Sequence, residues 1–128
     1  MPIVHIHIIK GRPLAQRQAL LSAVHSALVE AFHIPPQDSN QILHEHEPEH
    51  FQSSKGPSFT LVEISAFAGR SLDAKRALYA AIARNLERDA STSKESLMVV
   101  LNEQPLENWG IRGGQAASDV SLGFQVKV

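Results

Sequence analysis

The hydrophobic and polar positions of the chain change their spacing in a regular order. A run of branched residues at 2–9 is followed by apolar positions at helical spacing over 14–32. A second branched and aromatic run at 59–67 is followed by the same helical spacing over 72–86. Branched and aromatic runs are typical of strands, and apolar residues three or four apart are typical of helices that face a core. The pattern predicts a strand and then a helix, twice.

Local signals mark the ends of both predicted helices. Pro13 suits the first helical turn, and Ser71 suits an N-cap. The first helix must end by Pro35 and Pro36, because proline cannot continue a helix and disfavours helical geometry in the residue before it. A further strand is expected after each helix, at 39–46 and at 96–102, with 52–58 as the connecting loop.

The two parts of the chain align with each other at a constant offset, which we call the repeat alignment. It matches Gly11-Arg12 with Gly69-Arg70, Arg17 with Lys75, Ala19-Leu20 with Ala77-Leu78, and Glu45 with Glu103. We therefore expect one α+β domain over 1–128, built as a tandem β-α-β repeat with halves at about 1–50 and 58–103. Two such units, each with parallel strands, can share one four-stranded mixed sheet with both helices on one face.

The other face of this sheet is left without a helix to cover it. The run FTLVEISAF at 59–67 is apolar at most positions on both sides, which indicates that both faces are buried. Another subunit is the expected cover. After Glu103 we expect a glycine-rich turn (NWGIRGG) and a final short strand (LGFQVKV), which could pair with a neighbour's sheet.

Composition and charge remove several classes of function. The chain has 12 basic and 13 acidic residues, and neither sign forms a long run. No electrostatic footprint for nucleic acid or an anionic membrane is present. The absence of cysteine excludes disulfide and thiol chemistry, and no signal peptide or membrane-spanning run is recognisable. We expect a cytoplasmic protein with no nucleic-acid or membrane partner.

The Met-Pro start is the first candidate for chemistry. Removal of Met1 frees the secondary amine of Pro2, which is a titratable group at the start of a strand. A proline amine is normally too basic to act as a base at neutral pH, but nearby cations or an apolar pocket lower its pKa. Arg12, Arg70 and Arg112 are candidate cations. The dipeptide alone is weak evidence, because Met-Pro is also an ordinary start.

Seven histidines raise the alternative of a metal site. His44 and His46 alternate on one predicted strand and share a face, as a pair of zinc ligands can, and His50 follows. No third ligand stands at a defined spacing, which favours a solvated strand edge. We therefore predict no metal site. His5 and His7 share a face of the first strand, where they line a pocket or an interior between subunits.

Four segments of the chain together resemble a known family. The opening MPIVHIHIIKGR, the helix end AFHIPPQD, the second-half GRSLDAKRALYAAIARNL and the tail ENWGIRGG are similar to the tautomerase superfamily of 4-oxalocrotonate tautomerase-like proteins. The similarity covers nearly the whole chain and is strongest to long members related to malonate semialdehyde decarboxylase. It implies a doubled β-α-β fold, a homotrimer, and an N-terminal proline that works without metal or organic cofactor.

The resemblance also implies roles for individual residues. Pro2 matches the catalytic proline, Arg70 an arginine that binds the substrate carboxylate, Asp38 the acidic residue after the first helix, and Trp109 an aromatic pocket wall. Two positions depart from the decarboxylase subgroup. Ala68 stands where that subgroup has a second arginine, and Ile111 stands where it has a phenylalanine. A decarboxylase-type reaction is therefore less favoured than proton transfer.

Several of these residues have an ordinary structural interpretation as well. Arg12 is the repeat equivalent of Arg70, but a surface arginine is its default interpretation. Asp38 can shape a turn after the prolines. Trp109 can be plain packing. Arg112, between glycines, can offer a second carboxylate contact.

The sequence predicts an isomerase that moves a proton on a small 2-oxo or enol carboxylate. Pro2 takes the proton as a general base, and Arg70 holds the carboxylate and polarises the enolate. One alternative keeps the fold but uses a cationic Pro2 as general acid, with Asp38 activating water for hydration, dehalogenation or decarboxylation. A second alternative is a non-catalytic trimeric binding protein.

Overall fold

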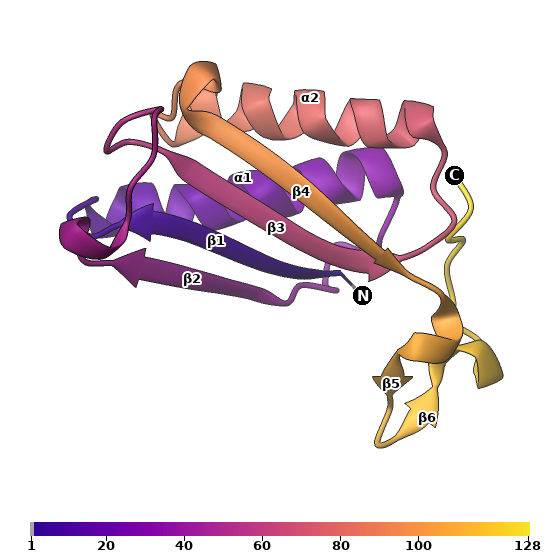
Figure 1. Cartoon of the computed structure of the whole chain (residues 1–128). Coiled ribbons are helices and arrows are strands. Elements are labelled where there is room, and N and C mark those ends of the chain that lie inside the picture. The colour runs from indigo at the N-terminus through magenta and orange to yellow at the C-terminus, as the bar shows by residue number, and fades with distance from the viewer. Residues whose placement is uncertain (1) are drawn as a thin grey trace.

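The computed structural model describes residues 2–128 of the chain, and Met1 lies outside the described residues. Two long helices and a four-stranded sheet make up most of the molecule, and a small hairpin extends from one end of the sheet (Figure 1). The elements in chain order are β1 (Ile3–Ile9), α1 (Leu14–Phe32), β2 (Gln41–His46), β3 (Thr60–Phe67), α2 (Leu72–Asp89), β4 (Leu97–Gln104), β5 (Gly110–Ile111) and β6 (Gln115–Ala116).

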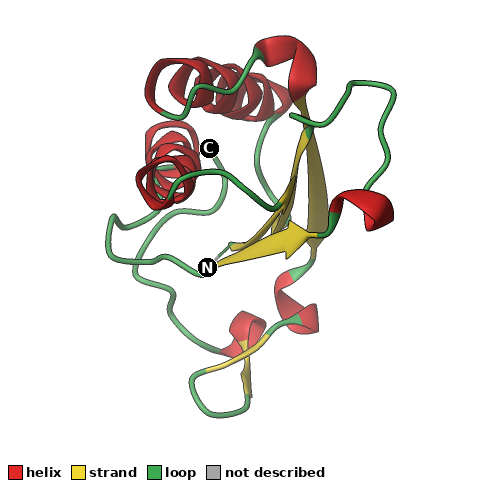
Figure 2. Ribbon diagram, turned by 90° about the vertical axis from the view of Figure 1, so that its left-hand side faces the viewer, coloured by secondary structure: helices red, strands yellow, loops and turns green. Residues whose placement is uncertain are grey.

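The sheet has the strand order β2-β1-β3-β4. Each β-α-β half contributes one parallel pair, β1 with β2 and β3 with β4, and the two central strands β1 and β3 run antiparallel. Both helices lie on the same side of the sheet (Figure 2). The predicted α+β fold with a mixed four-stranded sheet and two helices on one face is confirmed.

Alternation along the central strands separates a buried face from a partly open face. Val4, Ile6 and Ile8 of β1 are at most 1% exposed and pack beneath the helices. Their neighbours Ile3, His5, His7 and Ile9 point to the other face and are half-buried. The strand β3 alternates in the same way, so in the single chain its second face is only partly buried, and its cover by another subunit stays a prediction. We call this second side the open sheet face.

Local chemistry explains where the helices begin and end. The Ser71 hydroxyl accepts a hydrogen bond from the Ala74 amide at 3.1 Å, which confirms it as the N-cap of α2. Pro13 precedes the first residue of α1 instead of lying inside its first turn. His33 ends α1 in the left-handed conformation, and its amide bonds to the Val29 carbonyl. Neither helix of the described chain is long and apolar enough to cross a membrane.

The repeat is visible as a pair of equivalent ion pairs. Arg17 at the start of α1 meets Glu45 of β2 at 3.4 Å, and at the equivalent positions of the second half Lys75 at the start of α2 meets Glu103 of β4. Each pair ties a helix to the second strand of its own half. These side chains are among those that the repeat alignment matches, so the repeat in the sequence corresponds to a repeat in space.

The C-terminal segment differs from the prediction. The glycine-rich turn forms as expected, as the connection between β5 and β6. Residues 122–128 form no strand, so the predicted final strand is wrong for the single chain. The segment passes the end of β3 instead of lying along an edge strand: the Ser71 amide donates to the Val128 carbonyl at 3.1 Å, and Val126 packs beside Gly69.

Candidate active site

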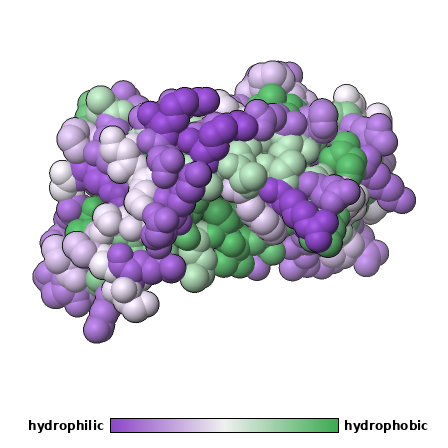
Figure 3. All heavy atoms as spheres, turned by 90° about the horizontal axis from the view of Figure 1, so that it is seen from above, coloured by the Kyte–Doolittle hydropathy of each residue, from purple (hydrophilic) through white to green (hydrophobic). Residues whose placement is uncertain are grey.

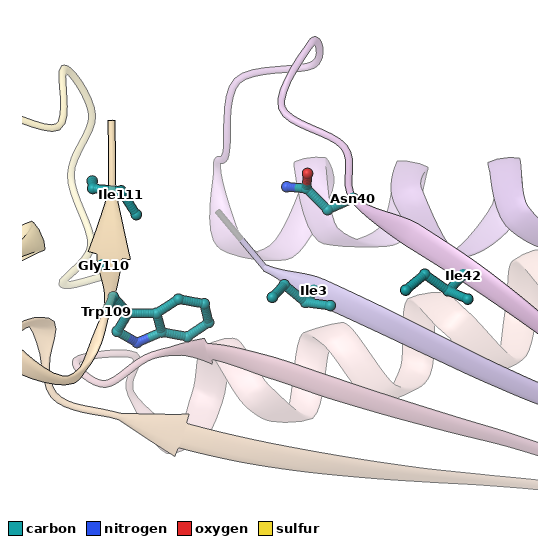
Figure 4. A pocket seen from close by; sticks show the side chains of 6 residues that line it. All are labelled: Ile3, Asn40, Ile42, Trp109, Gly110 and Ile111. Carbon is teal, nitrogen blue, oxygen red and sulfur yellow. The ribbon is translucent and has the colours of Figure 1, made fainter. Parts of the chain in front are cut away.

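An apolar pocket opens beside the first residues of β1. Its volume is about 390 Å³. Pro2 is buried at the start of the strand, and its neighbour Ile3 points into the pocket (Figure 4). The β5 hairpin provides the facing wall. The lining residues are Ile3, Asn40, Ile42, Trp109, Gly110 and Ile111.

Packing against β3 holds the Trp109 side chain at this pocket. Its ring meets Phe67 edge to face with 5.0 Å between the ring centroids. The indole N–H donates to the Gln104 carbonyl at 3.4 Å, and the Trp109 carbonyl accepts from the Ala117 amide at 2.9 Å. These contacts join the hairpin to the last residues of β3 and β4. The aromatic wall predicted from the sequence therefore lies close to the start of β1.

Asn40 is a pocket residue that the sequence did not reveal. Its carbonyl accepts from the Val4 amide at 2.9 Å, and its side-chain amide donates to the Pro2 carbonyl at 3.5 Å. The residue thus contacts the backbone on both sides of Ile3. It lies directly before β2, in the segment predicted as a strand over 39–46, and only the pairing of β1 with β2 brings it to Pro2.

A second, more polar pocket of about 310 Å³ adjoins the first. Asp38 and Arg112, both predicted as site residues, line it together, and Ile111 is a wall of both pockets. The backbone of Arg112 has a φ of 49°, as a non-glycine residue rarely has. The remaining lining residues are Pro35, Gln37, Leu122 and Phe124.

Arg70 lies at the Pro2 end of the sheet but lines neither pocket. Because β1 and β3 are antiparallel, with Ile3 opposite Ser65, the segment that follows β3 is near the start of β1. Arg70 is 7% exposed as a residue, and its guanidinium donates to the Phe67 carbonyl at 3.0 Å and stacks over the Phe32 ring at 4.7 Å.

The Arg70 side chain is not fully satisfied. Its Nε has no hydrogen-bond partner among residues 2–128, and a buried donor without a partner typically costs about 1–3 kcal/mol. Burial lowers the pKa of Arg70, and the negative charge of Glu103 opposes that shift. Arg70 thus offers a desolvated charge and a spare donor at the Pro2 end of the sheet.

Arg12 lies at the opposite end of the sheet from Pro2. The seven residues of β1 separate the two, a length of about 20 Å for a strand. Its guanidinium donates to the Ser58 carbonyl at 3.0 Å and to the Thr60 hydroxyl at 2.9 Å, and burial lowers its pKa. Within one chain the structure therefore does not bring Arg12 together with the other predicted site residues.

Comparison with known proteins identifies the family of this fold and pocket. Two family models, each described as tautomerase enzyme, match residues 38–112 and residues 2–55. The chain belongs to the tautomerase family. A relative in Bacillus subtilis (strain 168), the probable tautomerase YrdN, is 31% identical over 122 residues, which cover 91% of this chain and 95% of the relative.

Solved structures agree with this tautomerase assignment. The FG41 malonate semialdehyde decarboxylase, solved with 3-bromopropiolate as inhibitor, is 27% identical with a TM-score of 0.79, covering 94% of this chain and 98% of that one. A fused 4-OT, solved as a symmetric trimer, is 25% identical with a TM-score of 0.82, covering 91% and 96%. Together with the family assignment, these similarities support tautomerase-type catalysis in general.

Proposed function

We propose that this protein is a cofactor-independent tautomerase that uses the amine of Pro2 as a general base on a small 2-oxo or enol carboxylate. The observation that carries the proposal is the apolar pocket beside the start of β1, walled by Ile3, Trp109 and Ile111. An apolar setting disfavours the charged ammonium form of an amine, because burial penalises the charged state. Removal of Met1 is part of the proposal, since only then does Pro2 carry a free secondary amine.

The proposed reaction moves one proton. The neutral amine of Pro2 takes a proton from carbon or from an enol oxygen, and the electron pair left behind delocalises into the neighbouring carbonyl as an enolate. The prolinium then returns the same proton at a different position, so the enzyme is regenerated and nothing is consumed. Cationic groups near the carbonyl stabilise the negative charge of the enolate.

Two arginines at the Pro2 end of the sheet are proposed to hold the substrate carboxylate. Arg112 lines the second pocket, and Arg70 offers its buried, incompletely satisfied guanidinium behind Phe67. A guanidinium fork matches a carboxylate in a bidentate fashion. Arg12 can take this role only in a neighbouring copy, because in its own chain it lies at the other end of the sheet.

We also propose a homotrimer, as in the fused 4-OT that resembles this chain. Three apolar side chains on the open sheet face remain well exposed in the single chain: Ile42 at 48%, Met98 at 47% and Val100 at 38%. Ile42 lies on the edge strand β2, and the other two lie on the edge strand β4. A closed ring of copies can bring these two edges together.

One observation favours a second candidate, a hydratase or decarboxylase in which a cationic Pro2 is the general acid. Asp38 and Arg112 line one pocket, so a carboxylate that could activate water lies in the same cavity as a carboxylate-binding group. Against this candidate, Ala68 at the end of β3 offers no second cation. The pH dependence of kcat/KM decides: a base gains activity as its proton leaves, whereas an acid loses it.

Covalent labelling tests the central proposal. The 3-bromopropiolate that inhibits the related malonate semialdehyde decarboxylase is incubated with the full chain, and peptides are mapped by mass analysis. We expect the label on Pro2, with Met1 absent and activity lost in proportion to labelling. A protein that retains Met1, or that is labelled only elsewhere while activity persists, contradicts the proposal. Trapping of Pro2 without any turnover of enol carboxylates favours the binding protein.

A further inference from the structure

Four histidines form a continuous ladder on the open sheet face, and none of them is among the proposed catalytic residues. His5 and His7 come from β1, and His44 and His46 come from β2. Two cross-strand hydrogen bonds of 2.8 Å join them, one between His5 Nδ1 and His44 Nε2 and one between His7 Nδ1 and His46 Nε2. We call these four residues the histidine ladder.

The rings of the ladder also stack on one another. The His7 and His44 rings are almost parallel, with centroids 4.4 Å apart and an interplanar angle of 9°. Stacking at 5.0 to 5.1 Å joins His5 to His44 and His7 to His46. Each hydrogen bond between two imidazoles needs one ring nitrogen to donate and the other to accept. The arrangement therefore fits neutral rings, or at most one proton shared within each pair.

The surroundings of the histidine ladder supply little negative charge. Glu63 of β3 approaches His7 Nε2 at 3.2 Å and is the one acidic group in contact with the ladder among residues 2–128. Phe51, in the loop after β2, packs against His46 at 5.4 Å. The positions of β4 on the same face are uncharged: Met98, Val100 and Asn102. A fully protonated ladder would place four cations beside one carboxylate.

In the single chain, burial and a neighbouring ring already disfavour the protonated form of one ladder residue, His7. The pKa of His7 lies below its usual value, because burial disfavours the charged ring and His44 adds to the effect, while Glu63 opposes it. A histidine with a lowered pKa in the folded state binds fewer protons than in the unfolded state, so its contribution to stability is lost as pH falls below about 6.5. Covering the face with a second copy increases the burial.

The composition of the open sheet face points to another copy of this chain as its cover. The ladder lies toward the β2 edge with Ile42, while the β4 edge carries exposed Met98 and Val100 and no charged group on this face. A closed ring of copies makes heterologous contacts, in which the β2 side of one copy meets the β4 side of the next. The α2 side, seen from above in Figure 3, is a different face of the molecule, on which hydrophobic surface lies between hydrophilic areas.

A metal ion is a poorer occupant of the same ladder. The two histidine pairs use the facing ring nitrogens for hydrogen bonds to each other. Within residues 2–128 no group of three or more histidine or acidic side chains is arranged to hold a metal. Zinc sites normally need three or four protein ligands.

We propose that the histidine ladder is buried against the neighbouring copy in the trimer, and that the trimer holds together only while the ladder is largely neutral. This inference rests on the homotrimer of the proposed function. Protonation of the ladder at low pH places repelling cations in a contact that lacks compensating acidic groups. The ladder thus makes assembly dependent on pH in the range where histidine titrates.

Light scattering of the full chain across pH 8 to pH 5 tests the proposal, over a range of protein concentrations. We expect a trimer at pH 8 and smaller species at pH 5. If each copy excludes one proton on assembly, the association constant of the trimer falls roughly a thousandfold per pH unit below the histidine pKa, because tenfold is lost for each excluded proton. Far-UV circular dichroism at each pH shows whether the chain stays folded.

Substitutions separate the ladder from general effects of acid. The double variant His7→Gln/His44→Gln removes the closest stacked pair, and its trimer is expected to persist at pH 5. The control His25→Gln/His50→Gln changes two histidines outside the ladder and is expected to dissociate like the native chain. The single variant His44→Gln serves if the double variant does not fold, and it is expected to shift the transition to lower pH.

The outcomes distinguish the inference from the proposal on which it rests. A native trimer that persists at pH 5, or ladder variants that dissociate at the same pH as the control, overturns the inference and leaves the trimer standing. A monomer at pH 8 overturns the trimer itself. Catalysis is tested separately by the Pro2 labelling experiment, which does not depend on the ladder.

Discussion

The first half of the chain, from β1 to β2, and the second half, from β3 to β4, carry the same ion pair in the same place. Arg17 with Glu45 and Lys75 with Glu103 each tie a helix to the second strand of its half. Glycines 11 and 69, also matched by the repeat alignment, both have a positive φ, of 121° and 136°. These shared features stabilise the framework, by which we mean the sheet of β1 to β4 and its two helices.

The halves differ where each one begins. Pro2 starts the first half, and the equivalent residue of the second half is Thr60, a buried threonine that accepts a hydrogen bond from Arg12. Arg12 follows β1 and Arg70 follows β3, so the two arginines lie at opposite ends of the sheet and contact different partners. Arg70 is at the end with Pro2 and both pockets, and Arg12 is bonded within the framework.

The open sheet face shows the same divergence. In the repeat alignment the positions of the histidine ladder, His5, His7, His44 and His46, correspond to Glu63, Ser65, Asn102 and Gln104. One half thus presents titratable rings and the other mainly neutral polar groups. Residues that both halves retain serve the fold, and residues that only one half has are the candidates for chemistry and assembly.

The largest expected effect comes from substituting alanine for the residue at which a half begins. Pro2→Ala is expected to lower kcat/KM for an enol carboxylate by about 10²–10⁴-fold, the usual contribution of a general base. Thr60→Ala, at the equivalent position, should change activity less than about threefold and lower the free energy of unfolding by about 1 kcal/mol, through loss of the bond to Arg12. Steady-state kinetics and urea unfolding measure the two effects. Equal activity of Pro2→Ala and the native enzyme contradicts the proposal.

A smaller effect on catalysis is expected at Arg70 and Arg12, the two arginines that the repeat alignment matches. Arg70→Lys keeps the charge but loses the planar fork and the stacking on Phe32, so we expect kcat/KM to fall about 10–100-fold. Arg12→Lys should lower stability by about 1 kcal/mol, because two hydrogen bonds are disturbed, and leave kcat/KM within about threefold.

Kinetics of both arginine variants, with separate kcat and KM, check this difference. A loss of activity in Arg12→Lys without a loss of stability shows instead that Arg12 completes the site of a neighbouring copy. The comparison of the halves then holds for the single chain but not for the assembly.

The sequence predicted the framework because the framework is periodic and repeated. Spacing located both helices, Ser71 was recognised as a cap, and the repeat alignment found the side chains of both ion pairs. The family resemblance added Trp109 and Ile111, which the structure places in the pocket beside Pro2.

The parts that escaped prediction depend on contacts between distant segments. Asn40 and Phe124 lie in segments predicted as strands, but a strand pattern does not show which pocket a residue reaches, and only strand pairing and the path of the tail bring them to the pockets. The tail at 122–128 has the alternation of a strand but runs past Gly69 instead of along an edge. The histidine ladder needed the register of β1 with β2, which the sequence does not show.

The equivalent glycines give a difference in stability alone. An alanine at Gly11 meets no atom within 4 Å, so Gly11→Ala should cost only the strain of a positive φ, about 1–2 kcal/mol. At Gly69 the added Cβ comes within 3.2 Å of Val126, which packs there from the C-terminal tail. We expect Gly69→Ala to cost about 1 kcal/mol more, as an overpacked contact does. Urea unfolding of both variants measures the difference, and equal losses contradict a tail that packs tightly on Gly69.

The smallest difference is expected between the two ion pairs. The side chains of Lys75 and Glu103 are 24% and 25% exposed, against 32% and 30% for Arg17 and Glu45. Less exposed pairs are less screened by water and salt, so Glu103→Gln should cost about 1 kcal/mol and Glu45→Gln about 0.5 kcal/mol.

Glu103 has a second effect that Glu45 does not share in the part of the chain described. Its negative charge acts on Arg70, which stays protonated with or without it. Removing that charge leaves the guanidinium less compensated and lessens the repulsion of a carboxylate substrate. We expect KM to fall about two- to threefold in Glu103→Gln and to stay unchanged in Glu45→Gln, with kcat similar in both. If instead KM changes equally in both variants, the ion pairs influence the site through the framework, and the two halves are more strongly coupled than their separate contacts indicate.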